Sequence, residues 1–374
     1  MKYHIVLTSV HARRFEKASL ATEELPKFDL SMLAESLNAT FITPESYQIK
    51  FIDRIGASLA GTPENWAYAR AIASQLTSDD VVFCPGEEIG IPLASVCRGK
   101  PNRPKIVVWF HRITGIKGRM ALKLCDIGRS VDLAVVSSSS NKQFLQNYLN
   151  FTEEQILFWW NPVDVDYFAS KTFTVNNPRP LIVSSGLERR NYSLLAAATE
   201  NLDVDVKVAG FSQFQSRVAK NFPKVMPKNM SNRKYSLPEL VELYHSADLV
   251  ALCLRENDGT CGVTVLSEAM ACSKAVVCTR TKGLSDYLDD RDAVMTIEPG
   301  DVAGLQKAIL SLLNNPAEAK LRGQRAYKLV KERCDVKNQI DVLAQFMRTF
   351  EKTQKVSTNS SINSPRLRVE TSSQ

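Results

Sequence analysis

Short apolar runs alternate with longer amphipathic segments in the first half of this 374-residue chain. Each run is continuous and a few residues long, as expected for strands buried in a parallel sheet. Segments between them, such as Trp66–Leu76 and Asn141–Leu149, have apolar positions at helical spacing. The runs are Ile5–Leu7, Val81–Cys84, Ile106–Phe110, Leu133–Val136 and Ile156–Trp160. Alternating strands and helices predict a doubly wound α/β sheet.

A second series of strands and helices follows the polar, proline-containing stretch 172–180. Its strands are expected near Leu181–Ser184, Val204–Ala209, Leu249–Cys253, Ala275–Cys278 and Ala293–Thr296. The pattern therefore predicts two α/β domains, 1–170 and 171–352. The last helix, 336–350, is amphipathic and able to pack back on the first domain. Residues 353–374 are rich in Ser, Thr, Asn and Gln, and we expect a disordered tail there.

The predicted architecture also indicates where a ligand binds. In open α/β sheets, ligands bind beyond the carboxyl ends of the strands. With two such domains, the cleft between them is the expected site. The N-terminal run, Met1–Val10, is interpreted as the first strand and not as a cleavable signal peptide.

The amino-acid composition is typical of a globular protein and argues against several other classes. The hydrophobic content of 44% and the charged content of 23% are typical of globular chains. No apolar run approaches the roughly 18 residues of a membrane-spanning helix. The eight cysteines form no CxxC pair and there are only four histidines, so we expect a reducing, cytoplasmic compartment and no metal site.

The net charge of +7 is concentrated in one stretch. Between Arg98 and Lys123 lie eight basic residues and no acidic one. Part of this stretch, Ile116–Leu124, is expected to form a helix with apolar positions. We expect an anionic membrane surface, the inner leaflet, as a partner for it, and no nucleic acid. The competing interpretation is a basic helix that is merely solvated.

The segment 256–286 has the order loop, helix, strand and turn, with glycines in the loop. Gly259 and Gly262 permit close approach of a ligand to the backbone. The helix expected from Val263 presents free N–H groups, which favour an anion. Glu268 falls in its second turn, where a carboxylate can accept both hydroxyls of a ribose-like diol. The alternative is a solvated helix glutamate.

This segment resembles the donor-binding motif of retaining glycosyltransferases of the GT-B type, family 4, the glycosyl transferases group 1. The residues that match the family, in order and spacing, are EAMA at 268–271 and KAVV at 274–277. The resemblance implies that Glu268 binds the nucleotide ribose. It also implies that Gly262, Val263 and Thr264 lie near the diphosphate and the sugar.

One position departs from the family. Where the family usually has a glutamate, eight residues before Glu268, this chain has Thr260. Glu256 and Asp258 lie upstream in the same loop, and either is a candidate donor contact. The residues alone do not choose between them.

A second candidate site is the segment SSGLERRNY, 184–192, directly after a predicted strand. The turn at Gly186 is followed by Arg189 and Arg190, whose guanidinium groups suit a departing diphosphate. In the similar family a basic residue after this glycine contacts the diphosphate. Arg190 fits that spacing best, and Arg189 is the alternative.

The remaining candidates come mainly from the resemblance. His111 follows a strand, and in the similar family a histidine there faces the sugar donor; a lone histidine at a strand end is otherwise structural. Arg233 and Tyr235 are expected near the nucleobase. The segment 161–164 resembles the family's hinge between domains. The loop 84–88, with two glutamates, is a weaker candidate for the acceptor side.

Together these features predict a GT-B-like fold of two Rossmann-like domains. The implied activity is retaining transfer of a hexose from a UDP- or GDP-sugar to a hydroxyl of a glycan, a lipid-linked molecule or a small molecule. We expect no cofactor and no tightly bound metal. Two alternatives stay open: a nucleotide-sugar epimerase of the same fold, and a non-catalytic binding or scaffold protein. A dinucleotide dehydrogenase is disfavoured because no GxGxxG follows a strand.

Overall fold

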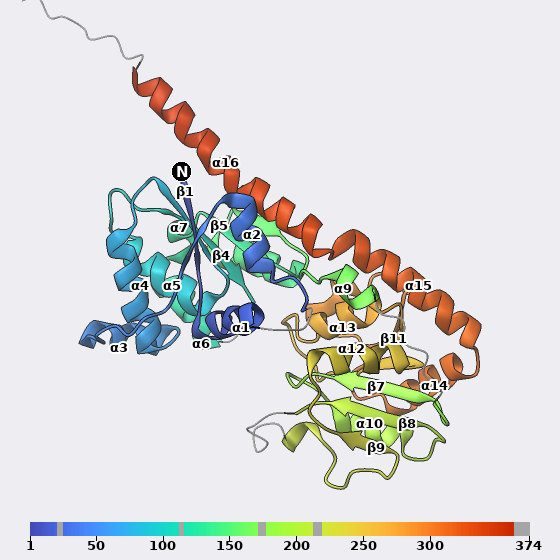
Figure 1. Cartoon of the computed structure of the whole chain (residues 1–374). Helices are drawn as coiled ribbons and strands as arrows, with labels where there is room; N and C mark the ends of the chain where they lie inside the picture. Colours follow the sequence, from blue (N-terminus) through green and yellow to red (C-terminus); the bar gives the residue numbers. More distant parts are fainter. Residues whose placement is uncertain (21–24, 112–115, 171–176, 212–218, 363–374) are drawn as a thin grey trace, which may run out of the picture.

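The computed structural model describes residues 1–20, 25–111, 116–170, 177–211 and 219–362. Within this part of the chain there are two six-stranded sheets, and every strand pairing is parallel. The two-domain α/β fold expected from the sequence is confirmed (Figure 1).

The N-terminal domain carries the sheet β2-β1-β3-β4-β5-β6. Its strands are β1 (Lys2–Val6), β2 (Thr40–Ile42), β3 (Asp80–Cys84), β4 (Lys105–Phe110), β5 (Leu133–Val136) and β6 (Ile156–Phe158). Its helices are α1 (Ser9–Leu20), α2 (Asp29–Leu37), α3 (Phe51–Leu59), α4 (Pro63–Gln75), α5 (Glu87–Cys97), α6 (Ile116–Leu124), α7 (Ile127–Ser130) and α8 (Ser139–Leu149), with a 3-10 turn η1 (Glu153–Gln155).

The C-terminal domain carries the sheet β12-β11-β10-β7-β8-β9. Its strands are β7 (Leu181–Ser185), β8 (Asp205–Ala209), β9 (Met230–Asn232), β10 (Leu249–Leu252), β11 (Ala275–Thr279) and β12 (Val294–Ile297). Its helices are α10 (Tyr192–Thr199), α12 (Leu237–Ser246), α13 (Val263–Ala271), α14 (Val302–Leu313) and α15 (Pro316–Arg333), with 3-10 turns η2 (Ala219–Asn221) and η3 (Lys282–Tyr287).

The chain crosses between the domains twice, at adjacent places. The first crossing leads from β6 into α9 (Val165–Ala169), and the second leads from α15 into α16 (Val336–Ile362). The two crossings are hydrogen bonded to each other: the Val163 amide donates to the Cys334 carbonyl at 2.9 Å, and the Val336 amide donates to the Val163 carbonyl at 3.0 Å. The segment 161–164, expected at the hinge, therefore lies at this double crossing.

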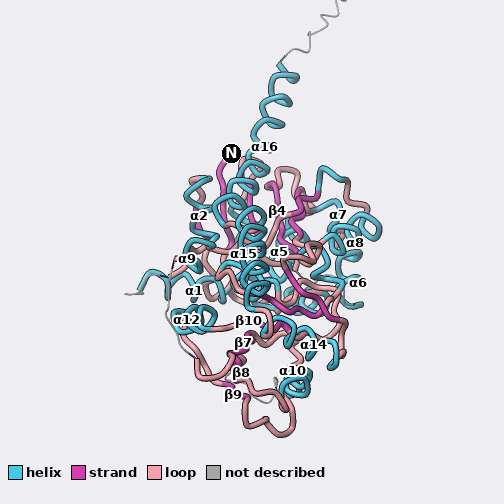
Figure 2. The backbone as a smooth tube through the Cα atoms, turned by 90° about the vertical axis from the view of Figure 1, so that its right-hand side faces the viewer, coloured by secondary structure: helices cyan, strands magenta, loops and turns pink. Residues whose placement is uncertain are grey.

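Helix α16 packs on the N-terminal domain, although it follows the C-terminal domain in sequence. Ile340, Leu343 and Met347 share a buried core with Leu33 of α2. Figures 1 and 2 show α15 and α16 running along one side of both domains. Burial of this apolar face ties the end of the chain to the first domain.

Two segments differ from the sequence-based expectation. The first strand ends at Val6, and the residues after Thr8, interpreted as a strand end and loop, begin helix α1. Helix α16 continues through residues 353–362, which were assigned to a disordered tail. A helix propagates one hydrogen bond per added residue and needs no buried face to do so, and no proline interrupts this segment. The rest of the expected tail, 363–374, lies outside the described residues.

Candidate functional site

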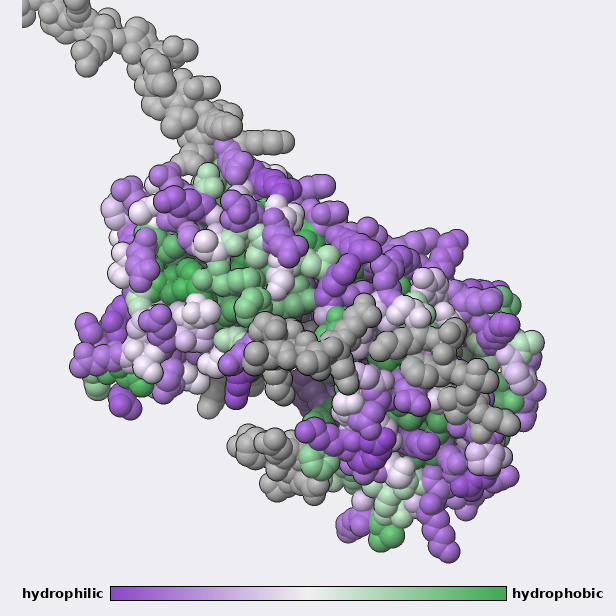
Figure 3. Space-filling view, viewed as in Figure 1, coloured by the Kyte–Doolittle hydropathy of each residue, from purple (hydrophilic) through white to green (hydrophobic). Residues whose placement is uncertain are grey.

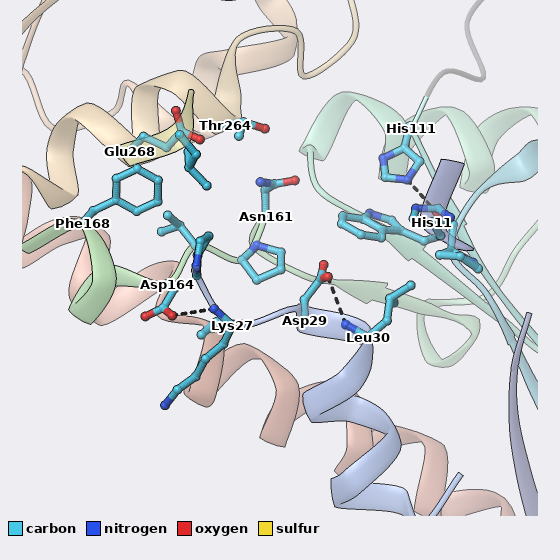
Figure 4. Close-up of a pocket in the computed structure, with 17 residues that line it drawn as sticks. His11, Lys27, Asp29, Leu30, His111, Asn161, Asp164, Phe168, Thr264 and Glu268 are labelled. Atoms are coloured by element: carbon cyan, nitrogen blue, oxygen red, sulfur yellow. Dashed lines mark hydrogen bonds between the residues drawn. The ribbon is translucent and has the colours of Figure 1, made fainter. Parts of the chain in front are cut away.

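A cavity of about 450 Å³ lies between the two domains, at the carboxyl ends of the strands. Figure 3 shows the hollow between the domains, and Figure 4 shows side chains from both domains pointing into it. Glu268 and Thr264 line it from α13, and His111 lines it from the end of β4. The remaining lining residues are His11, Pro26, Lys27, Asp29, Leu30, Pro85, Trp109, Asn161, Pro162, Val163, Asp164, Phe168, Leu237 and Val336.

Glu268 is held by a chain of hydroxyl groups. The Tyr244 hydroxyl donates to Glu268 Oε2 at 3.0 Å. Because this hydroxyl is a donor to the carboxylate, the Ser185 hydroxyl, 2.6 Å away, donates to it in turn. Tyr244 is fully buried, and burial together with the neighbouring Glu268 raises its pKa well above the usual value. The phenol therefore stays protonated and fixes one carboxylate oxygen.

Arg190 is buried directly beneath the two glycine turns of the predicted donor site. Its Nε donates to the Ser185 carbonyl at 2.7 Å, and its Nη1 donates to the Glu188 carbonyl at 2.9 Å. A Cβ added at Gly186 would lie 2.4 Å from Nη2 of Arg190, and one at Gly262 would lie 3.4 Å from Nη1. Both glycines have positive φ, +89° and +98°, so the turns need glycine for conformation as well as for space.

Arg189 has the opposite environment from Arg190. Its φ of +56° turns the side chain outward, and the residue is exposed. Its carbonyl accepts from the Arg255 amide at 2.8 Å, which ties the turn to the end of β10. The structure therefore brings Arg190, and not Arg189, to the glycines at 186 and 262.

His111 faces Glu268 and Thr264 from the opposite wall of the cavity (Figure 4). Its Nε2 lies 2.9 Å from the Pro85 carbonyl, an acceptor, so this nitrogen carries the proton. Its ring packs on Trp109 with centroids 4.2 Å apart, and its backbone amide donates to Glu87 Oε2 at 3.0 Å. The imidazole is thus fixed in position, with Nδ1 as its acceptor in the neutral form.

The glycine loop between β10 and α13 approaches His111 without contributing to the cavity wall. A Cβ at Gly259 would lie 3.8 Å from the His111 carbonyl. Glu256 and Asp258 are exposed, Thr260 is half-buried, and none of the three lines the cavity. The choice between Glu256 and Asp258 as a donor contact stays a prediction.

Val263 is the buried first residue of α13, which begins at Gly262 without a side-chain cap. The N–H groups of its first turn face the same region as Arg190, where they add to the positive potential.

The matched motif at 274–277 has a structural role: Lys274 Nζ donates to the carbonyls of His245 and Ala247 at the end of α12. Burial lowers the Lys274 pKa.

Arg233 and Tyr235 line a different cavity, of about 400 Å³, beside β9 and α12. The Arg233 guanidinium lies 3.7 Å from the centre of the Tyr235 ring and 2.9 Å from Glu239 Oε1. Two residues further on, Leu237 lines the cavity between the domains. The structure therefore does not bring this pair to Glu268, and their role at a nucleobase stays a prediction.

Several cavity residues were not found from the sequence. Lys27, in the segment before α2, and Asp29, the first residue of α2, line the cavity, and Asp164 accepts from the Lys27 amide at 2.8 Å. In the sequence, Tyr244 occupies an ordinary buried position of an amphipathic helix. Its contact with Glu268 therefore could not be predicted from the neighbouring residues. His11 could have been proposed as a cavity residue from one feature of the sequence: it is a polar residue shortly after the first strand.

Comparisons with known proteins agree with this geometry. The family model described as Glycosyl transferases group 1 matches residues 182–315, from β7 through α14. No curated protein sequence matches the chain.

Solved structures resemble nearly the whole chain at low sequence identity. A glycosyltransferase from Rickettsia africae is 16% identical, with a TM-score of 0.68, over 94% of this chain and 99% of that one. Sucrose-phosphate synthase from Thermosynechococcus elongatus is 13% identical, with a TM-score of 0.68, over 94% and 100%. The Anabaena protein HepE, solved in complex with UDP and glucose, is 14% identical, with a TM-score of 0.64, over 93% and 99%. At these identities the likeness establishes the fold.

Proposed function

Because the chain has the GT-B fold and its C-terminal domain belongs to the group 1 glycosyl transferases, we propose that the protein transfers a hexose from a nucleoside-diphosphate sugar to a hydroxyl acceptor with retention. The observation that carries this proposal is the set of hydrogen bonds that links Glu268 to Arg190. Tyr244 donates to Glu268 and pairs with the Ser185 hydroxyl, and the Ser185 carbonyl accepts from the buried Arg190 guanidinium, beside the helix N-terminus where a nucleotide ribose and its diphosphate would lie.

The donor is a nucleotide sugar in this proposal, and UDP is the first nucleotide to test. Structures similar to this chain include HepE with UDP and glucose. Arg190 and the first turn of α13 would stabilise the charge that develops on the departing diphosphate. This arrangement needs no tightly bound metal, because the guanidinium and the backbone dipoles supply the positive charge.

On the other wall, His111 would meet the sugar or the acceptor. Its Nδ1 can accept a hydrogen bond from a hydroxyl, while Nε2 stays bound to the Pro85 carbonyl. The departing phosphate itself would take the acceptor proton, so the proposal requires no protein general base. Asp29, whose carboxylate points into the cavity (Figure 4), is the side chain best placed to hold the acceptor.

Two alternatives make different predictions. An epimerase would convert a nucleotide sugar in the absence of acceptor, whereas a transferase would at most hydrolyse it slowly. A non-catalytic binding protein would bind the nucleotide without turnover, and Thr260, in place of the usual glutamate, is the feature that favours it.

The proposal is tested by the substitution Glu268→Gln. Loss of a charged hydrogen-bond acceptor costs about 1.5–3 kcal/mol, so we expect UDP affinity to fall by about ten-fold or more in calorimetric titration. Turnover of the donor should fall at least as much. The amide keeps the size of the side chain, so the fold should survive.

The matched control is Glu200→Gln, because Glu200 is an exposed glutamate at the end of α10. Its nucleotide affinity should equal that of the unchanged protein. Equal affinity in the Glu268→Gln variant would remove the main support for the proposed donor site.

A further inference from the structure

The helices α3 and α6 contact each other at one edge of the N-terminal domain, and together they expose five large apolar side chains. The exposed fractions are 78% for Phe51, 63% for Ile52, 50% for Ile55, 57% for Met120 and 63% for Leu124. Figure 3 shows apolar surface over α3, the helix labelled at the lower left of Figure 1. We propose that this α3–α6 surface docks the protein on a membrane that contains anionic lipid.

Each helix has the composition of an element that lies in a membrane interface. On α3, Phe51, Ile52 and Ile55 fall on one face, whereas Asp53 and Gly56 face inward and are buried. On α6, Met120 and Leu124 are four residues apart and face outward, whereas Leu122 is fully buried. Apolar side chains on an exposed helix face gain free energy when they enter the acyl boundary.

The charges around these apolar side chains are positive. Lys50, Arg54, Arg119 and Lys123 are exposed, and the described part of the chain gives none of them a salt bridge. The carboxylate on α3, Asp53, is buried and paired with Arg70 at 2.8 Å. A hydrogen bond from Thr62 and the charge of Arg54 lower the Glu64 pKa, so Arg54 has an acidic neighbour. Among the described residues, Arg119 and Lys123 have no carboxylate partner, and anionic headgroups would meet these two cations beside the apolar face.

Two basic side chains of α6, those of Arg119 and Lys123, are directed over aromatic rings of α8. The Arg119 guanidinium lies 5.0 Å from the ring centre of Phe144, and Lys123 Nζ lies 4.8 Å from that of Tyr148. These contacts hold the cations next to Met120 and Leu124 without neutralising them.

Only this half of the basic stretch 98–123 takes part in the docking surface. Arg103 and Lys105 are paired with Asp132 at the opposite end of β4, at 2.5 and 2.9 Å. Arg98 is paired with Asp126 at 3.1 Å. The part of the basic stretch proposed for docking is therefore α6, where the sequence already predicted apolar positions, and α3 adds apolar contacts that the sequence analysis did not predict.

The docking surface is linked to the cavity between the domains through a second cavity and Thr8. The loop that leads into α3 lines a second cavity, of about 510 Å³, together with Thr8. The Thr8 hydroxyl lies 2.8 Å from Nδ1 of His11, which lines the cavity between the domains. If the proposed transfer is correct, an acceptor held in the membrane would reach the cleft by this route.

A lipid surface fits these residues better than a second copy of the chain. Self-association would bring the same four cations of each copy close together, and like charges at an interface oppose binding. A membrane with anionic headgroups compensates the cations and covers the apolar residues at the same time.

The test is flotation of the full chain with vesicles of phosphatidylcholine alone or mixed with phosphatidylglycerol, without nucleotide or acceptor. We expect flotation with the mixed vesicles, weakened by salt. The variant Phe51→Ser/Ile52→Ser/Ile55→Ser should lose about ten-fold or more in partitioning. Arg119→Gln/Lys123→Gln should lose about 25-fold, because each charge contributes about five-fold.

The matched control is Val225→Ser/Met226→Ser, because these exposed apolar residues lie on the C-terminal domain, and its flotation should be unchanged. Circular dichroism checks the fold of each variant, and Met120→Ser/Leu124→Ser repeats the test on α6. Equal flotation with neutral and mixed vesicles would overturn the proposal, as would a serine variant of α3 that floats like the unchanged protein. A stable dimer that the serine variants dissociate, with no flotation, would instead identify self-association. Because the assay contains no nucleotide, its result is independent of the role of Glu268.

Discussion

Arg189 and Arg190 are neighbours in one turn, but the side chain of Arg189 is exposed and that of Arg190 is buried. The left-handed backbone at Arg189 exposes its side chain, whereas Arg190 is 3% exposed and pairs with Leu254 through an isolated bridge. Among the described residues, Arg190 contacts backbone carbonyls and has no carboxylate partner. A buried cation without a counter-ion is costly, and a bound diphosphate would supply the missing charge.

We expect Arg190→Lys to lower turnover of the donor by about 100-fold or more, because leaving-group charge grows toward the transition state. Lysine keeps the charge but loses the forked geometry. Binding of the free nucleoside should change little. Steady-state kinetics and nucleoside titration measure the two effects, with Arg189→Lys as the control. The assignment would be contradicted if Arg189→Lys lowered turnover of the donor and Arg190→Lys left it unchanged.

At the scale of the element, helix α13 depends on the glycine that precedes it. Gly262 has a φ of +98°, and a Cβ there would lie 3.2 Å from Leu254 and 3.3 Å from Leu252. This close packing fixes the position of the first turn of α13 relative to Arg190. Gly300 has a similar φ, +84°, but open space around it.

The two glycines form a matched pair for substitution by alanine. Both variants should lose about 1–2 kcal/mol of unfolding free energy, the cost of a left-handed alanine. Only Gly262→Ala should also weaken UDP binding, because the added methyl group displaces the first turn of α13. Chemical denaturation and calorimetry measure the two quantities. If both variants bound UDP like the unchanged protein, α13 would not form the proposed diphosphate site.

At the scale of the whole molecule, the two domains are joined by a contact between α8 and η3. Asp286 Oδ1 accepts from the Ser139 hydroxyl at 2.6 Å, and Oδ2 accepts from the Ser139 amide at 2.9 Å. A carboxylate of the C-terminal domain thus accepts two hydrogen bonds from the first residue of α8, a helix whose N-cap is Ser138. Tyr287 adds a second contact by accepting from the Asn161 amide at 3.0 Å.

We expect Asp286→Ala to loosen the relative placement of the domains, since a hydrogen bond to a charged group contributes about 1.5–3 kcal/mol. The radius of gyration from small-angle scattering should rise and the KM for the acceptor should increase. UDP affinity should stay the same, because Glu268 and Arg190 belong to one domain. Asp289→Ala is the control, since Asp289 pairs with Arg333 inside the C-terminal domain. An unchanged scattering profile for Asp286→Ala would argue against this contact as a restraint.

Among the described residues the sequence pattern predicted ten of the twelve strands, including the edge strands β6 and β12. Runs such as 81–84 and 275–278 are continuous and apolar because both faces of a parallel sheet are covered. The two strands that the pattern missed, β2 and β9, have three residues each and lie at sheet edges. β2 has no buried residue and β9 has one, Met230, so neither carries the run of buried apolar residues that marks the edge strand β6.

The sequence by itself determined the two-domain α/β architecture, and it placed Glu268 in a helix after a glycine loop, Arg190 after a glycine turn and His111 at a strand end, because these elements have local signals. Tertiary structure alone decided which side chains meet. It placed Tyr244 against Glu268, turned Arg190 inward and returned α16 to the first domain. It also joined the apolar residues of α3 to the cations of α6. These contacts join residues far apart in the chain, and their free energy comes from burial and pairing that local sequence does not encode.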